Sequence, residues 1–251
     1  MKLSLELPTA YLDYFSKLTD FEFCLAQVAL ESPEYAEFYK KQGKAGRMVI
    51  LDNGFHEMGR PLSVPELEKA VELVTPSLVV APDWIGKPVE TFDAFEKMAV
   101  RMKGHPSTSL AAVLVGRDQQ ERASYFMNVA PRVKMLCFPY REPRQVWFQE
   151  LFESYPRVEA WPQFIHLLGM SDFEEAQWWK RIERRWPFPP YTLSIDTAKP
   201  VKWGLENIPM DFDTNPRGSK VSSADLHKIT DIDPAKMQMI LRNLAYLRRF
   251  I

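Results

Sequence analysis

The sequence predicts an α/β protein, a single-domain (β/α)8 TIM barrel that spans residues 1–251. Seven short, β-rich apolar segments alternate with helical stretches along the chain. Their apolar residues are nearly continuous, which is typical of parallel strands that are buried on both faces. The length suits one barrel, and the repeated strand-helix units favour it over an open doubly wound sheet.

The expected strands share this apolar character and occupy 21–29, 47–54, 77–84, 109–116, 132–139, 163–169 and 191–198. The expected helices show amphipathic patterns and occupy 63–74, 91–103, 118–128, 143–154, 172–185 and 235–250. Ser63 and Glu66 form a capping-box pattern at the first of these helices, and Asp172 is a candidate N-cap. The eighth strand has two candidates, 3–7 and 208–212, so we expect an irregular eighth unit.

Composition narrows the classes of function. The net charge is −1, so any contact with nucleic acid requires a local basic patch. Cys24 and Cys137 lie in apolar runs and are expected to be reduced core residues of a cytoplasmic protein. Motifs of the CxxC or HExxH type do not occur, so we expect no metal and no other cofactor. No apolar run approaches the roughly 20 residues that cross a membrane, and the N-terminus is too polar for a signal peptide.

Acidic residues follow three of the apolar segments. Asp52 ends VILD, Asp83 ends VVAPD and Asp196 ends LSID. Because active sites of parallel barrels lie at the carboxyl ends of the strands, these three carboxylates are expected to converge. Clustered carboxylates shift one another's pKa, which suits acid/base or nucleophilic chemistry. The alternative is that each Asp only caps the loop that follows it.

Three further side chains are weaker candidates. His166, inside FIHLLG, is either a hydrogen-bonded core residue or part of a substrate pocket. His56 follows the Asp52 loop and Trp84 follows Asp83, so either could line the pocket. His227 is expected to be a surface residue.

Four segments together carry a family resemblance. The segment 51–57, LDNGFHE, is similar to a D-S-G-G-F-Q motif, and 80–83 reads VAPD. The segment 165–170, IHLLGM, is similar to H-x-L-M-G-V, and 194–201, SIDTAKPV, resembles D-C-x-x-P-T-R. In this order they resemble the tRNA-guanine transglycosylase superfamily, whose barrels exchange a purine base in nucleic acid. The resemblance covers about residues 47–202.

The resemblance implies a role for each matching residue. Asp196 would be the nucleophile that attacks C1′ of the sugar, Asp52 the general acid/base, and Asp83 the group that reads a guanine-type base. The substrate pocket would further contain Asn53, Gly54, His56, Trp84, His166 and Gly169. Phosphate contacts would come from basic side chains after the nucleophile, namely Lys199, Lys202, Arg217 and Lys220.

Departures from the family shift the expected substrate. The zinc site of three Cys and one His is missing, and Val115 stands where the family has a base-contacting Gln. The chain is also much shorter than the tRNA-modifying enzymes. It therefore resembles more closely the compact relatives, found in phages and in bacterial modification systems, that insert 7-deazaguanine bases into DNA. The expected partners are nucleic acid, with DNA favoured over tRNA, and a free 7-deazaguanine base; a homodimer and accessory modification proteins stay open.

Other functions remain as alternatives. A tRNA-guanine transglycosylase acting on RNA would use the same residues, and an N-glycosidase would make the same attack with water as acceptor. A metal-dependent amidohydrolase would need an HxH pair on an early strand, where FEFCLAQ has none. A non-catalytic nucleic-acid-binding barrel is the alternative that is not an enzyme.

Overall fold

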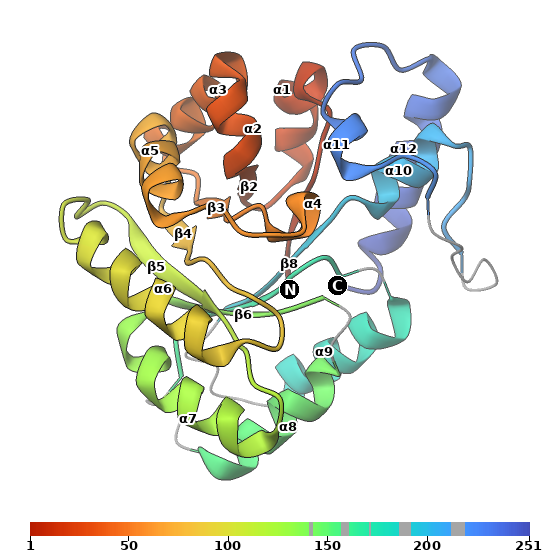
Figure 1. Ribbon diagram of the computed structural model, residues 1–251. Helices are drawn as coiled ribbons and strands as arrows, with labels where there is room; N and C mark the ends of the chain where they lie inside the picture. The colour runs from red at the N-terminus through yellow and green to blue at the C-terminus, as the bar shows by residue number, and fades with distance from the viewer. Residues whose placement is uncertain (141–142, 157–160, 171, 186–191, 212–218) are drawn as a thin grey trace.

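The computed structural model confirms the predicted barrel (Figure 1). It describes residues 1–140, 143–156, 161–170, 172–185, 192–211 and 219–251. Eight parallel strands pair in the order β1-β8-β7-β6-β5-β4-β3-β2, and helices surround them. The strands are β1 (Lys2–Leu5), β2 (Glu22–Leu25), β3 (Val49–Asp52), β4 (Leu78–Val80), β5 (Ser109–Val113), β6 (Met135–Phe138), β7 (Phe164–Leu167) and β8 (Thr192–Thr197).

The helices lie outside the sheet or at its carboxyl end. The α-helices are α1 (Leu12–Phe15), α2 (Ala26–Glu31), α3 (Pro33–Lys44), α4 (Phe55–Met58), α5 (Val64–Val74), α6 (Pro88–Met102), α7 (Gln119–Val129), α8 (Arg144–Ser154), α9 (Phe173–Arg185), α10 (Lys199–Leu205), α11 (Ser223–Leu226) and α12 (Pro234–Leu247). Short 3-10 turns are η1 (Thr9–Tyr11), η2 (Ser16–Leu18) and η3 (Ala130–Arg132). The capping box of Ser63 and Glu66 is present, and Asp172 accepts from the Glu174 N–H at 2.7 Å.

The sheet is nearly closed between β1 and β2. Asp20, just before β2, donates its backbone N–H to the Leu3 carbonyl at 2.8 Å and accepts from the Leu3 N–H at 2.7 Å. Arg248, beyond α12, donates to the same carboxylate at 2.7 Å. One acidic side chain therefore links the first two strands to the C-terminal segment.

Two apolar clusters hold the barrel together. The smaller one fills the interior and includes Phe23, Ile50, Val80 and Val113. The larger one lies between the sheet and the helices. Because successive side chains of a strand point to opposite faces, Cys24 lies outside the barrel while Phe23 and Leu25 lie inside. Both cysteines are buried and free of disulfides, as expected.

The structure corrects one predicted strand and decides between the two candidates for another. The segment 21–29 is not one strand, because β2 ends at Leu25 and Ala26 begins the helix α2. The apolar run continues because that helix is buried against the sheet, and apolar content alone does not distinguish the two. The eighth strand is β1, so the candidate 3–7 is confirmed; the described part of 208–212 contains no strand.

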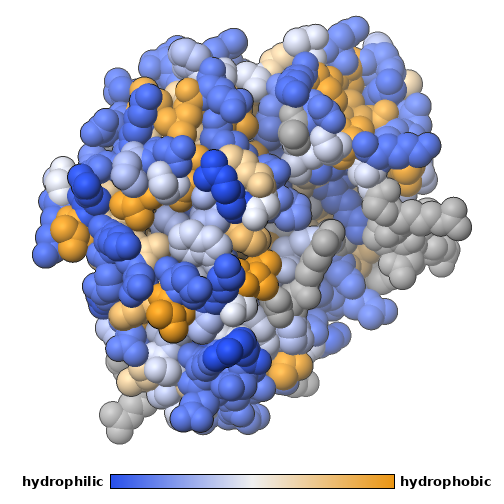
Figure 2. Space-filling model, in the orientation of Figure 1, coloured by the Kyte–Doolittle hydropathy of each residue, from blue (hydrophilic) through white to orange (hydrophobic). Residues whose placement is uncertain are grey.

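The C-terminal elements complete the wall of helices. Helix α10 packs against α12, where the Gly204 backbone lies so close to Ile240 that a methyl group would overlap it. The two chain ends lie side by side on α9: the Met1 amino group pairs with Glu183, and Lys180 donates to the Ile251 carbonyl (Figure 1). Figure 2 shows a face that is mostly polar, with separate apolar patches.

Candidate functional site

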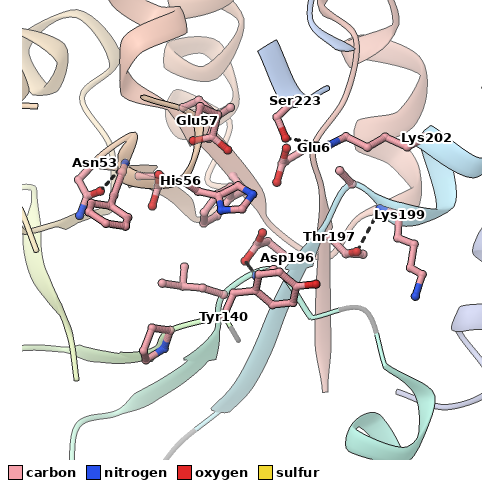
Figure 3. Close-up of a pocket in the computed structure, with 18 of the residues that line it drawn as sticks. Glu6, Asn53, His56, Glu57, Tyr140, Asp196, Thr197, Lys199, Lys202 and Ser223 are labelled. Atoms are coloured by element: carbon pink, nitrogen blue, oxygen red, sulfur yellow. Dashed lines mark hydrogen bonds between the residues drawn. The ribbon is translucent and has the colours of Figure 1, made fainter. Parts of the chain in front are cut away.

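The carboxyl ends of the strands surround a cavity of about 710 Å³, which we call the mouth cavity. Phe23 and Leu25 belong to its apolar lining. Its polar lining comes from the carboxyl ends of strands and from the loops and helices that follow them. It comprises Glu6, Asp52, Asn53, His56, Glu57, Asp83, Tyr140, Asp196, Thr197, Lys199, Lys202, Ser219 and Ser223 (Figure 3). The expected convergence of Asp52, Asp83 and Asp196 is therefore confirmed.

A buried histidine, His166, contacts the carboxylate of Asp196 and fixes its orientation. Asp196 Oδ1 lies 3.0 Å from His166 Nε2 and accepts from the Gly169 N–H at 3.0 Å. His166 is fully buried, stacks on Phe23, and places Nδ1 2.9 Å from Ser194 Oγ. A carboxylate oxygen only accepts, so the proton belongs on Nε2. Within the described residues no hydrogen bond reaches Asp196 Oδ2, which is thus available to a ligand.

Asp52 ends β3 beside a tight turn. Its Oδ2 accepts from the Gly54 N–H at 2.9 Å, and Gly54 has a left-handed φ of 77° that favours glycine. Burial is the largest cause of a raised pKa of Asp52. Together with the charges of Asp196 and Asp83, and against the hydrogen bond from Gly54, it raises the pKa from 3.8 to about 7. A carboxyl group with a pKa near neutrality can both take and give a proton at neutral pH.

Asp83 lies three residues beyond β4, in the loop, and an amide orients it. Asn53 Nδ2 donates to Asp83 Oδ1 at 2.8 Å and to the Ala81 carbonyl at 2.9 Å. Asn53 Oδ1 accepts from the Phe55 N–H at 3.0 Å, so the Asn53 side chain is fully used within the protein. Burial raises the pKa of Asp83 to about 6.

Two further acids were missed by the sequence reasoning. Glu6 follows β1, is only 8% exposed, and has an Oε2 without a hydrogen-bond partner in the described structure. Burial, then the charge of Asp196, raises its pKa to about 7. Glu57 on α4 is half-buried, and burial followed by the charges of Glu6 and Asp52 raises its pKa to about 9. A signal for Glu6 existed, since it also follows an apolar strand, but the position of that strand was left open.

The expected basic residues divide into two groups. Lys199 and Lys202 on α10 line the mouth cavity. Lys199 lies 4.6 Å above the Trp203 ring, and burial lowers its pKa to about 8; Lys202 donates to Ser223 Oγ at 2.8 Å. Lys220 is exposed and outside the cavity lining. Arg217 lies outside the described residues.

The remaining pocket candidates also divide. His56 and Gly169 line the cavity, and His56 packs edge-on against Tyr140 with ring centroids 6.1 Å apart. Gly54 and His166 are not part of the lining. Gly54 is hydrogen-bonded to Asp52 and His166 to Asp196, and both of these carboxylates line the cavity. Trp84 is not part of the lining either, whereas its neighbour Ile85 is.

Two expectations outside the cavity can also be compared with the structure. Val115 lies in a neighbouring cavity of about 460 Å³, whose wall also contains Asp83. His227, expected on the surface, is half-buried, with Nδ1 3.1 Å from the Leu7 carbonyl oxygen. Burial lowers the pKa of His227 to about 4.

The described residues contain no cluster of three or more His, Cys, Asp or Glu side chains arranged to hold a metal ion. Within the same residues, no helix has the length and apolar character needed to span a membrane. No known protein family matches the chain, and a search of curated proteins finds no match. The fold and site thus define a (β/α)8 barrel with a carboxyl-rich cavity at the carboxyl ends of its strands.

Proposed function

We propose that the protein is a base-exchange transglycosylase that replaces guanine in nucleic acid, with DNA favoured, by a 7-deazaguanine derivative. The observation that carries this proposal is the geometry of Asp196. One of its carboxylate oxygens is fixed by His166 and Gly169, and the other is available inside a cavity that also contains Asp52 and Asp83. Attack on a sugar carbon needs a carboxylate whose orientation is fixed before the substrate arrives.

The reaction divides into two balanced steps. Asp196 Oδ2 forms a bond to C1′ of the sugar while the bond from C1′ to the purine nitrogen breaks, and its electron pair leaves with the purine. Asp52 gives the departing base a proton. The incoming base then loses a proton to Asp52, its nitrogen attacks C1′, and the Asp196 carboxylate is released.

Base selection falls to Asp83 in this proposal. A carboxylate can accept from the ring N–H and the exocyclic amine of guanine, whereas adenine does not present this pair of donors. Asn53 fixes the orientation of Asp83. The target nucleotide must leave its stack to reach the cavity, so a flipped or single-stranded base is required.

The phosphates are assigned to Lys199 and Lys202, because both lie on the helix that follows the nucleophile strand. If a few phosphates are bound, affinity falls steeply as the salt concentration rises. A DNA preference rests on the cysteines of this sequence, because Cys24 and Cys137 cannot supply the three cysteine ligands of the zinc site in the tRNA-modifying enzymes.

The test uses the whole chain with single-stranded and duplex DNA, tRNA, and an isotope-labelled 7-deazaguanine base. We expect incorporation of label into polymer by the wild type and none by Asp196→Ala. Circular dichroism checks that the variant remains folded. Full incorporation by folded Asp196→Ala would refute the mechanism, and label found only in tRNA would refute the choice of DNA.

The same assay decides the alternative reaction. An N-glycosidase would release guanine and leave abasic sites, without incorporating label. Binding without either product would indicate a non-catalytic nucleic-acid-binding barrel.

A further inference from the structure

Glu6 lies one residue beyond β1, the strand that pairs with the strand of the proposed nucleophile. Strands β1 and β8 pair in parallel with Ser4 opposite Asp196 and Leu5 opposite Thr197, and the Glu6 N–H donates to the Thr197 carbonyl at 3.2 Å. Alternate residues of a strand share a face and rise by about 6.6 Å per two residues. The side chain of Glu6 therefore projects into the mouth on the strand next to Asp196, one layer closer to the opening (Figure 3).

The carboxyl group of Glu6 lies near a lysine and a serine that are bonded to each other. Lys202 donates to Ser223 Oγ at 2.8 Å. The charge of Lys202 and, to a smaller extent, Ser223 lower the pKa of Glu6 and so favour its ionised form. Its Oε2 is buried without a partner in the part of the chain that the structure describes. A buried carboxyl oxygen without a donor is costly, and such groups call for a functional explanation.

We propose that Glu6 contacts the sugar of the target nucleotide and stabilises the positive charge that develops on C1′ and the ring oxygen during exchange. This inference rests on the proposed function, since it needs a sugar carbon over Asp196. When the bond to the purine loosens, the sugar acquires oxocarbenium character. An acidic group already fixed beside that position stabilises the cation without having to reorganise.

The surrounding charges support the assignment. The groups that act on Glu6 are Asp196 on β8, Asp52 on β3 and Lys202 on α10. Asp196 opposes ionisation of Glu6 in the free protein, but the negative charge of Asp196 diminishes as its bond to C1′ forms. Ionisation of Glu6 therefore becomes more favourable during the first step. Glu6 is ionised beside the ester, and it is in place when positive charge develops on the sugar again in the second step.

The experiment compares wild type, Glu6→Gln and the matched control Glu72→Gln. Each substitution keeps the size of the side chain. Glu72 lies on α5, is exposed and does not line the mouth cavity. We expect Glu6→Gln to lower kcat by about 100-fold, the loss typical of one stabilising group, with the KM for the free base within threefold. Glu72→Gln should stay within threefold of the wild type.

A second measurement separates contact with the sugar from a structural role. The secondary kinetic isotope effect of tritium at C1′ reports positive character on that carbon, and it should decrease in Glu6→Gln if the carboxylate stabilises the cation. In Glu6→Gln, a kcat within threefold of wild type or an unchanged isotope effect would overturn the proposal for Glu6 alone, and so would an equal loss of kcat in Glu72→Gln. If the wild type neither exchanges nor releases base from any polymer, the proposed function fails and this inference fails with it. If the wild type only releases base, the same comparison applies to that release.

Discussion

The contact between His166 and Asp196 allows a prediction that does not depend on the reaction. In His166→Phe the ring volume is retained, but two interactions of a fully buried side chain are lost: 3.0 Å to Asp196 Oδ1 and 2.9 Å to Ser194 Oγ. A hydrogen bond to a charged group contributes about 1.5–3 kcal/mol, and a neutral one about 0.5–1.5 kcal/mol. The free energy of unfolding should therefore fall by roughly 2–4.5 kcal/mol.

A double-mutant cycle isolates the part that belongs to the carboxylate. Urea unfolding is measured for wild type, His166→Phe, Asp196→Ala and the double variant, with fluorescence of the seven tryptophans as the probe. The coupling between the two positions should be about 1.5–3 kcal/mol, because the Ser194 bond is lost equally on both sides of the cycle. A coupling below about 0.5 kcal/mol, the error of additivity, would refute this description of how Asp196 is held.

Two further predictions concern the other carboxyl groups. Asp83→Asn should fold normally but lose at least tenfold of its preference for guanine over adenine in a competition assay; unchanged preference would remove Asp83 from base reading. For Asp52, the native pKa of about 7 lies above the ordinary 3.8, so the folded protein binds the proton more tightly and loses stability as the pH rises from about 4 through 7. Asp52→Asn should therefore stabilise the protein by roughly 2–4 kcal/mol at pH 8 and by little at pH 4, and equal urea-unfolding differences at the two pH values would contradict this.

The barrel could be predicted because each strand-helix unit has its own recognisable sequence pattern. A parallel strand that is covered on both faces is largely apolar, so β3, β4 and β6 stand out in the sequence as nearly continuous apolar runs. The strand β1 has apolar residues at Leu3 and Leu5, but it is short and no earlier strand-helix unit sets its expected position. Only its pairing with β8 identifies it as a strand of the barrel. A single sequence carries no record of such a long-range pairing.

The site residues that could be predicted are those whose residue type contrasts with the apolar sequence around them. Asp52 and Asp196 each end an apolar run. Burying a carboxyl group costs free energy, so its presence in such a run indicates a specific role. Asn53 lines the cavity, as expected, but its hydrogen bond to Asp83, like that of Gly54 to Asp52, depends on contacts that no spacing encodes. Trp84 is not among the residues that line the mouth cavity, whereas its neighbour Ile85 is.

The protonation of the mouth cavity bears on how a polyanion could enter it. A cavity with five ionised carboxylates would repel phosphates, but the raised pKa values of Glu57, Glu6 and Asp52 leave part of them neutral at pH 7. Lys199 and Lys202 lie on one side only, after β8, whereas Asp83 lies beyond β4. If the proposed function holds, we expect the phosphates over α10, the sugar between Asp196 and Glu6, and the base toward Asp83. This order places the negative phosphates against the two lysines and the N–H donors of guanine against a carboxylate.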